Sequence, residues 1–398
     1  MNTELKTEPT PQHNAKAMQA PLSGHSLDQG AVGDSRTEHT PTAIVYCEGN
    51  FARIDGKTAN GLIRHSQSYR IVSVIDSTQD GSDSGMVLDG VINHIPVFAT
   101  LQAAIKNEPA TPDTLIYGMA PSSGKLSPTD RGVVRAAIAD GMNIVSGLHE
   151  YLSDDAEFSA LAASRGVTIR DIRKPKLSKD MRLFDGSVAK VGAIRIAVLG
   201  TDCAIGKRTT ATVLARALNA QGIKTVLVGT GQTGLMQGAR YGVAMDAVPP
   251  QFCCGELEGA IVAASDAEQP DVILIEGQGA LSHPAFCTSA FILRGSQPDA
   301  VILQHAPKRA HRCDFPDMAM PDPLAEIALI EAFADTRVIG LTINHEHMSD
   351  AEIAAAITNW SEKLGLPVTD ALSRPAARLV GLVQEAFPDL CQKPGVAA

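Results

Sequence analysis

The segment at residues 200–210, GTDCAIGKRTT, has the residue types and the setting of a loop that binds phosphate groups. An apolar stretch precedes it and a helical pattern follows it, so its backbone N–H groups would surround an anion at the positive end of a helix dipole. We predict that it binds phosphate through Gly200, Thr201, Asp202, Cys203, Ala204, Ile205, Gly206, Lys207, Arg208, Thr209 and Thr210.

The loop departs in two ways from the GxxxxGK[ST] pattern of nucleotide-hydrolysing enzymes. Five residues, rather than four, separate Gly200 from Gly206. Arg208 stands where the hydroxyl residue that holds Mg²⁺ is expected, and the hydroxyl of Thr209 is shifted by one position. The sequence therefore leaves two ligands open, a magnesium nucleotide or another phosphorylated molecule.

Two stretches with glycines follow later predicted strands, where ligands of open α/β sheets bind. In GTGQTG, Gln232 and Thr233 suit a polar ligand, and we predict that Gly231 and Gln232 bind the cofactor, although a tight turn would use the same glycines. In IEGQGALSHP, Glu276 ends an apolar strand. An acid there holds magnesium in a hydrolase, acts as general base in a transferase, or caps the next turn. His283 is a second candidate base, although a lone histidine is more often structural.

Basic residues gather in the stretch QHAPKRAHRC of an otherwise acidic chain. Such a cluster suggests a dianionic ligand, phosphate or dicarboxylate, or a solvated loop. In the N-terminal half, two more cations and the loop at residues 117–126 could face a cleft between domains. The candidate substrate-binding residues are Lys57, Arg64, His305, Lys308, Arg309 and Arg312. Cys313 lies among histidines, but the spacing is not that of a zinc site, and we expect no metal.

The composition excludes several classes of protein. The formal net charge of −10 argues against nonspecific binding of nucleic acid. The seven cysteines are scattered without a CxxC pair, which argues against a disulfide framework and fits a reducing compartment. The chain has no run of about 18 apolar residues and no signal-peptide pattern. We therefore expect a cytoplasmic protein without nucleic-acid or membrane partners.

The hydrophobic pattern predicts two domains. Residues 1–40 are rich in Pro, Ser, Thr, Gln and Asn and predict a disordered tail. In residues 41–172, short apolar strands alternate with helical stretches, which predicts a Rossmann-like parallel sheet, although no GxGxxG follows the first strand. Residues 173–192 form a charged linker, and residues 193–398 repeat the alternation. The predicted fold class is α/β, with two parallel-sheet domains, the second like a P-loop NTPase.

The motifs resemble two known groups. GTDCAIGK and IEGQGALSHP resemble segments of dethiobiotin synthetases, P-loop enzymes with the same five-residue spacing but with Thr directly after the lysine. Across about residues 42–390, EGNFARIDGKTANGLIR, GMAPSSGKL, GTDCAIGKRTT, GTGQTG, EGQGALSHP and QHAPKR occur in the order of a family long described as a domain of unknown function. That family pairs a Rossmann-like with a P-loop-like domain. The resemblance implies N-acetylation of D-glutamate by acetyl-CoA, a reaction to which members have been linked.

On this resemblance, the phosphates of coenzyme A would occupy the loop. No phosphoryl group is transferred, so the magnesium-holding hydroxyl would be dispensable and Arg208 would supply a second cation. Glu276, or else His283, would deprotonate the amine, and Lys207 or backbone N–H groups would stabilise the oxyanion. We expect acetyl-CoA and D-glutamate as substrates, no metal, and a homo-oligomer.

Two other function classes stay open at this point. An ATP- and Mg²⁺-dependent ligase or kinase of the dethiobiotin-synthetase type would form ADP. A nucleotide-sensing protein without catalysis would bind its ligand tightly and turn nothing over.

Overall fold

The computed structural model describes residues 40–53, 55–121 and 123–392. The tail predicted for residues 1–40 lies outside the described residues, apart from its last residue. Within the described residues, no helix is both long enough and apolar enough to cross a membrane.

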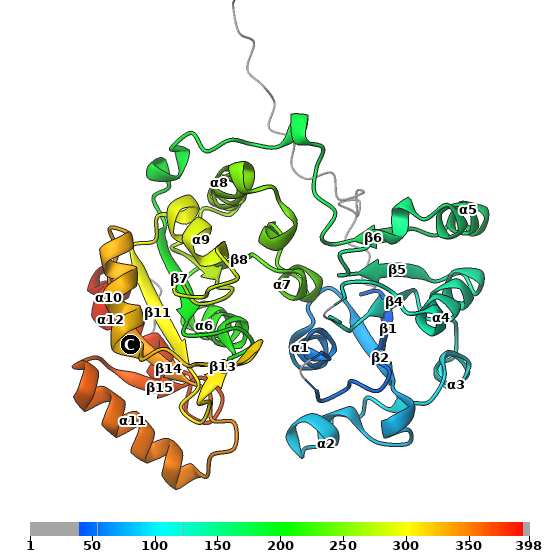
Figure 1. Ribbon diagram of the computed structural model, residues 1–398, viewed down its shortest axis with the longest axis horizontal. Helices are drawn as coiled ribbons and strands as arrows, with labels where there is room; N and C mark the ends of the chain where they lie inside the picture. Colours follow the sequence, from blue (N-terminus) through cyan, green and yellow to red (C-terminus); the bar gives the residue numbers. More distant parts are fainter. Residues whose placement is uncertain (1–39, 54, 122, 393–398) are drawn as a thin grey trace, which may run out of the picture. The chain divides into compact units, whose positions relative to one another are not determined.

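The N-terminal half of the described chain forms one six-stranded sheet in the order β3-β2-β1-β4-β5-β6 (Figure 1). Every neighbouring pair in it is parallel. The strands are β1 Thr42–Tyr46, β2 Arg70–Ile75, β3 Val97–Phe98, β4 Thr114–Tyr117, β5 Asn143–Ser146 and β6 Ile169–Asp171. The direction of winding reverses between β1 and β4, which is where ligands of such sheets bind.

Helices join these strands, and their ends follow from the local sequence. The helices are α1 Lys57–His65, α2 Ser84–Asp89, α3 Leu101–Lys106, α4 Pro128–Ala139 and α5 Ala156–Arg165. A capping box of Ser127 and Asp130 starts α4, with proline at its first position. Asp155 caps the start of α5, which ends at Gly166 in the left-handed conformation, φ +67°.

The C-terminal half forms a second parallel sheet in the order β15-β14-β11-β7-β10-β8-β9. The strands are β7 Ile194–Gly200, β8 Thr225–Gly229, β9 Tyr241–Gly242, β10 Val272–Glu276, β11 Ala300–His305, β14 Val338–Ile343 and β15 Val368–Asp370. A short antiparallel hairpin, β12 His311–Arg312 and β13 Phe315–Ala319, stands apart from this sheet. The sequence pattern did not predict the hairpin.

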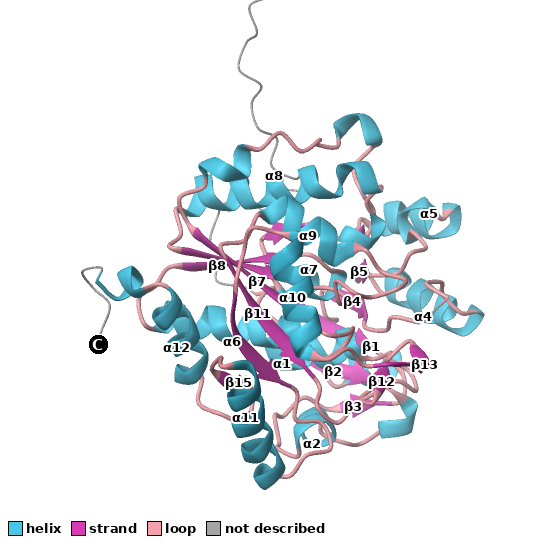
Figure 2. Ribbon diagram, turned by 60° about the vertical axis from the view of Figure 1, so that its left-hand side comes forward, coloured by secondary structure: helices cyan, strands magenta, loops and turns pink. Residues whose placement is uncertain are grey.

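Helices cover both faces of the second sheet (Figure 2). They are α6 Lys207–Ala220, α7 Gln232–Gln237, α8 Pro250–Glu268, α9 Thr288–Ser296, α10 Pro323–Phe333, α11 Asp350–Leu364 and α12 Ala377–Ala386. Residues of α8, α9, α10 and α11 share one core with the sheet, and those of α6 and α12 share another. The strands are buried on both faces, which explains their continuous apolar runs.

The two halves are joined through α1 and α7. The hydroxyl groups of Thr58 and Thr233 lie 2.8 Å apart, and Gln237 donates a hydrogen bond to the carbonyl of Gly61. Met236 of α7 belongs to the core of the N-terminal half. Since α1 follows β1 and α7 follows β8, the carboxyl ends of these two strands face a common region.

The segment 173–192, predicted as the linker, is bonded to the C-terminal half. Glu258 of α8 has no exposed surface, and its carboxylate accepts hydrogen bonds from the N–H groups of Asp185 and Val188. Arg173 forms an ion pair with Asp246 at 2.7 Å. The connection is therefore held against the helices that it passes.

Candidate functional site

The phosphate loop, residues 200–206, connects β7 to α6, and its path requires glycine at two positions. At Gly200, a Cβ atom would lie 2.8 Å from Ile205 Cδ1 and 2.9 Å from the carbonyl oxygen of Gln304. At Gly206, φ is +103°, in the left-handed region where side chains are strained. The loop thereby closes tightly over the end of the sheet and turns into α6 with its N–H groups at the helix start.

The phosphate loop offers unpaired donors. The N–H group of Thr201 bonds to the carbonyl of Gln304, at 3.0 Å. The N–H groups of residues 202–206 have no acceptor among the described residues. Successive N–H groups of this kind at a helix N-terminus form a concave anion site. The geometry agrees with the predicted phosphate-binding role of the loop.

Lys207 lies at the centre of this site, with 5% of its surface exposed. Its ammonium group donates a hydrogen bond to the carbonyl oxygen of Asp202. Burial lowers the pKa of Lys207, because the charged form is poorly solvated there. A bound phosphate would compensate that cost by pairing with the ammonium group.

Side chains from the ends of β11 and β14 brace the phosphate loop. Arg309 donates hydrogen bonds to the carbonyl oxygens of Cys203, at 3.2 Å, and Ala204, at 3.0 Å. Glu346 holds the same guanidinium group. Asn344 donates to the carbonyl of Ile205 at 3.1 Å. Because its carbonyl groups are held outward, the loop is preorganised for an anion.

The side chains of Arg208, Thr209 and Thr210, in the first turn of α6, lie in different directions. Thr210 donates its hydroxyl to Gln304 Oε1 at 2.6 Å, so this hydroxyl is already used. Arg208 turns toward α1, where a Cβ on Gly61 would lie 2.5 Å from its Nη2. Thr209 is half-buried and forms no side-chain hydrogen bond within the described residues. The position of Arg208 gives no support to its predicted role as a second phosphate-binding cation.

Glu276 ends β10, and its carboxylate lies against the start of α7. Its Oε2 accepts the N–H group of Thr230 at 3.1 Å, and a Cβ on Gly234 would lie 2.3 Å from the same oxygen. Burial raises the pKa of Glu276, while the guanidinium of Arg208 and the N–H groups of Thr230 and Gly231 oppose that rise. Glu276 therefore both caps the turn at Gly231 and balances the buried charge of Arg208.

Gln232 packs at the contact between the two halves. A Cβ on Gly147 of the N-terminal half would lie 2.9 Å from Gln232 Cγ. Gln232 is 7% exposed. Its predicted role in binding a ligand stays a prediction, and its visible role is packing.

His283 is buried beside the phosphate loop. Its ring stacks on Phe286, with the centroids 4.5 Å apart, and its Nδ1 accepts the N–H group of Ala285 at 3.2 Å. Burial lowers the pKa of His283. Its Nε2 lies 3.8 Å from Asp202 Oδ1. The structure thus places His283 beside the phosphate loop, a position the sequence did not predict, and its predicted role as a candidate base stays a prediction.

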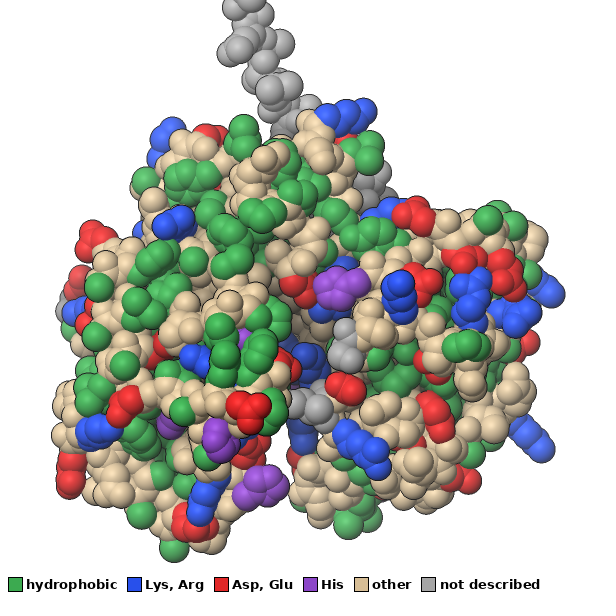
Figure 3. All heavy atoms as spheres, in the orientation of Figure 1, with side chains coloured by type: hydrophobic (Ala, Val, Ile, Leu, Met, Phe, Trp, Pro, Cys, Tyr) green, Lys and Arg blue, Asp and Glu red, His purple; other side chains and the backbone are tan. Residues whose placement is uncertain are grey.

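Most cations predicted to bind substrate are already paired. Arg64 forms a bidentate pair with Asp89, Lys308 pairs with Glu352 at 2.6 Å, and Arg309 pairs with Glu346. On the face shown in Figure 3, acidic and basic side chains are likewise intermixed.

Arg312 and His305 are also engaged. Arg312 donates to Thr201 O at 3.4 Å and to Ser282 Oγ at 3.0 Å, and only 7% of its surface is exposed. His305 Nδ1 lies 2.9 Å from Thr201 Oγ1, and burial lowers the pKa of this imidazole to about 4. Of the six predicted residues, Lys57 is exposed and has no ionic partner among the described residues. The other five already form hydrogen bonds or ion pairs within the protein.

A cavity of about 520 Å³ lies where β1 and β4 end. Glu48, Asn50 and Lys125 line it, and Lys125 is an exposed cation without an ionic partner in the described part of the chain. At its wall, the carboxylate of Asp130 accepts the hydroxyl groups of Tyr46, at 2.6 Å, and Tyr117, at 2.9 Å. Burial raises the pKa of both tyrosines.

Glu48, Asn50, Lys125 and Asp130 are not among the residues predicted for the site. The sequence signals for this β1/β4 cavity were the stretch EGNFARIDGKTANGLIR, which contains Glu48 and Asn50, and the loop at residues 117–126, which contains Lys125 and was expected to face a cleft.

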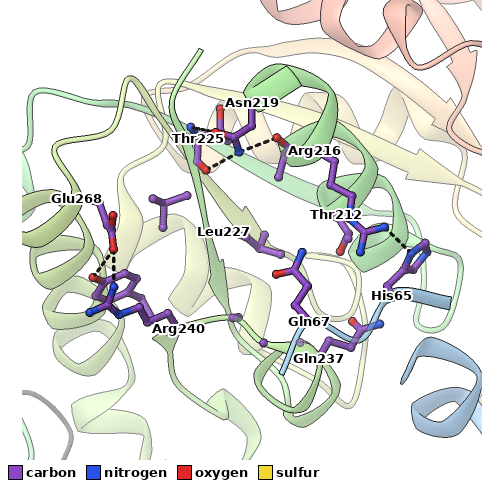
Figure 4. A pocket seen from close by; sticks show the side chains of 16 residues that line it. His65, Gln67, Thr212, Arg216, Asn219, Thr225, Leu227, Gln237, Arg240 and Glu268 are labelled. Atoms are coloured by element: carbon purple, nitrogen blue, oxygen red, sulfur yellow. Dashed lines mark hydrogen bonds and ion pairs between the residues drawn. The ribbon is translucent and has the colours of Figure 1, made fainter. Parts of the chain in front are cut away.

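A second cavity, of about 210 Å³, lies between α6, β8 and the end of α1 (Figure 4). His65 Nδ1 lies 3.3 Å from Arg216, and burial, followed by the charge of Arg216, lowers the pKa of His65 to about 4. Glu268 accepts a bond from Arg240 at 2.8 Å. This cavity is lined by α6 and β8 rather than by the phosphate loop.

Comparison with known proteins agrees with this architecture. The model of the P-loop domain of a domain of unknown function, DUF1611, matches residues 182–380, and the model of its Rossmann-like N-terminal domain matches residues 77–175. The chain belongs to the DUF1611 family. Both the predicted fold class and the family resemblance are thereby confirmed.

Relatives within the DUF1611 family are similar over most of the chain. A curated D-glutamate N-acetyltransferase of Tritonibacter scottomollicae is 35% identical over 273 residues, which cover 67% of this chain and 80% of that protein. Another from Pseudoalteromonas is 34% identical over 265 residues, covering 65% of this chain and 77% of that protein. The crystal structure of a DUF1611 family protein from Anabaena variabilis superposes with a TM-score of 0.80 at 29% identity, covering 87% of this chain and 99% of that one.

Proposed function

We propose that this protein transfers the acetyl group of acetyl-CoA to the α-amine of D-glutamate, and that its phosphate loop holds the phosphates of coenzyme A. The names of the two curated relatives support the reaction. One structural observation carries the assignment of the loop. Within the described part of the chain, the N–H groups of residues 202–206 lack acceptors, and the buried ammonium group of Lys207 bonds to the carbonyl of Asp202 in the same loop.

The chemistry of acetyl transfer fits the departures of the loop from the nucleotide-hydrolase pattern. Hydrolysis or transfer of a γ-phosphate needs a hydroxyl after the lysine to hold Mg²⁺. Here that position is Arg208, whose side chain turns to Gly61 of α1. Holding a pyrophosphate or a 3′-phosphate needs only N–H groups and a cation, and the loop supplies both.

Because coenzyme A is long, the residues that bind its phosphates differ from the residues that act at its thioester. Its phosphates and its thioester lie at opposite ends of the pantetheine arm, so phosphates held in the loop place the thioester away from Lys207. Lys207 then acts as a binding residue rather than as the oxyanion donor predicted from the sequence. By the same argument Glu276 is a positioning residue, which fixes the turn at Thr230 and balances Arg208.

The pantetheine arm of coenzyme A can run along the carboxyl ends of β8 and β1. The Thr58–Thr233 contact joins the region after β8 to the region after β1. The β1/β4 cavity opens in that second region, with Lys125 on its lining. We therefore assign the two carboxylates of D-glutamate to Lys125, which lines the cavity, and to Lys57 at the start of α1, both exposed and without an ionic partner among the described residues, and the general base to Glu48, which lines the same cavity.

A direct assay tests the reaction. Purified protein is incubated with acetyl-CoA and a panel of D- and L-amino acids, without nucleotide, while free thiol is followed. We expect thiol release that depends on D-glutamate and exceeds that with L-glutamate. Absence of thiol with every amine, together with ADP formation once Mg-ATP is supplied, would instead identify the loop as a nucleotide site.

A further inference from the structure

Two cysteines from distant parts of the chain meet at the rim of the phosphate loop. Cys203 lies in the loop, and Cys313 lies between β12 and β13. Their sulfur atoms and a carboxylate oxygen of Asp202 all lie within 4.8 Å of one another. Cys203 belongs to a second such group, with His283 and Asp314. Four other side chains that can bind a metal therefore lie near the thiol of Cys203, which the two groups share.

Two polar atoms of this cluster are buried without a hydrogen-bond partner in the part of the chain that the structure describes. They are Asp202 Oδ1 and His283 Nε2, which lie 3.8 Å apart on side chains with 0% exposure. Leaving a carboxylate oxygen and an imidazole nitrogen unpaired in the interior is costly, and most native proteins avoid it. A cation between the two atoms would satisfy both.

We propose that Asp202, Cys203, His283 and Cys313 bind a zinc ion. Two thiolates, one imidazole and one carboxylate are a donor set that suits zinc in tetrahedral coordination. Magnesium and calcium prefer oxygen ligands alone, so the two sulfur atoms select against them. Zinc ligation by His283 Nε2 places the ring proton on Nδ1, so the hydrogen bond that Nδ1 accepts from the N–H of Ala285 would be lost on metal binding.

The zinc site would join three separate segments. Asp202 and Cys203 come from the phosphate loop, His283 from the segment after β10, and Cys313 from the turn of the β12–β13 hairpin. The ion would thus fix the loop to the two segments beside it. This inference departs from the expectation that the chain binds no metal. It does not rest on the proposed acetyl transfer, because zinc binding is measured separately.

The test measures metal binding by the full chain. Reduced protein is titrated with zinc against a chromophoric chelator, and then with cobalt, whose thiolate complexes absorb in the near ultraviolet. We expect one zinc per chain and a cobalt–thiolate band. The Cys203→Ser and Cys313→Ser variants should each weaken zinc binding at least about 100-fold, since even the loss of an outer-shell partner weakens it by about 10–100-fold. Cys254→Ser, a half-buried thiol on α8, should bind zinc unchanged.

Two results would overturn the proposal. The first is that folded, reduced protein binds no zinc, or binds it equally well after either cysteine is replaced. The second is a Cys203–Cys313 disulfide found by peptide mapping of unreduced protein whose reduced form takes up no zinc. His283→Gln adds a milder probe, because it removes one ligand and leaves both thiols; thermal unfolding of each variant shows that it is folded.

Discussion

Replacement of Lys207 by methionine separates phosphate binding from catalysis. Methionine has a similar length and suits a site that is 5% exposed, so the fold should be kept. The substitution removes the ammonium group that would pair with a phosphate of acetyl-CoA. Hydrogen bonds to charged groups contribute about 1.5–3 kcal/mol, and each 1.4 kcal/mol is tenfold in affinity, so KM for acetyl-CoA should rise about 10–150-fold. The value of kcat should change little, since the thioester lies at the other end of the arm.

Acetyl-pantetheine, which lacks the nucleotide and its phosphates, provides the internal control. Wild-type protein should use it poorly, and Lys207→Met should use it no worse than wild type does. Lys308→Met, which removes a surface cation paired with Glu352, should leave both substrates unaffected. If Lys207→Met instead lowers kcat with both thioesters and leaves KM for acetyl-CoA unchanged, Lys207 stabilises the oxyanion and the phosphate assignment is refuted.

Three further predictions concern the substrate site, the contact between the halves, and a buried histidine. Lys125→Met should raise KM for D-glutamate about tenfold without changing KM for acetyl-CoA, and an unchanged KM for D-glutamate would remove Lys125 from the site. Gly132→Ala, in open space on α4, should raise the free energy of unfolding by up to about 1 kcal/mol, because alanine favours a helix over glycine. Gly61→Ala on α1 should give less of this stabilisation or none, because its Cβ would lie 2.5 Å from Arg208 Nη2 and that side chain must shift. Equal gains for the two variants in chemical denaturation would contradict the tight contact. Burial lowers the pKa of His305 to about 4 in the folded state, below its value in the unfolded state. The unfolded state therefore takes up more protons as the pH falls from 7 to 5, and this lowers the free energy of unfolding by about 2 kcal/mol over that range. His305→Gln should remove that share of the decline, and an unchanged pH dependence of unfolding would show that His305 is not buried in its neutral form.

The two sheets could be predicted because their strands are buried on both faces. β10, for example, reads VILIE and is fully buried along its length, so its apolar run is visible without any tertiary information. The phosphate loop was equally visible, because its glycines, its lysine and the start of α6 are contiguous. The short β12–β13 hairpin was not, since its strand pairs hold only through distant contacts and its sequence has no alternating pattern.

The roles of the cations could not be predicted, because their partners are remote in sequence. Arg309 and Glu346 are 37 residues apart, and Lys308 and Glu352 are 44 residues apart. The basic stretch alone suggests free charges, whereas the fold pairs Lys308 and Arg309 with carboxylates and gives Arg312 oxygen acceptors on Thr201 and Ser282. The direction of the Arg208 side chain was also beyond prediction from the loop sequence. Successive residues of a helix point about 100° apart, so the residue after Lys207 turns away from the loop, toward Gly61.

We propose that this protein acetylates D-glutamate with the phosphates of acetyl-CoA in its loop, and a single reaction can test this proposal. The most direct measurement follows both products in one reaction without nucleotide, the coenzyme A thiol by its absorbance with a disulfide reagent and N-acetyl-D-glutamate by mass spectrometry. We expect the two products to appear in equal amounts, and free coenzyme A added at the start to compete with acetyl-CoA. Thiol release without N-acetyl-D-glutamate, or no release at all from folded protein, would contradict it.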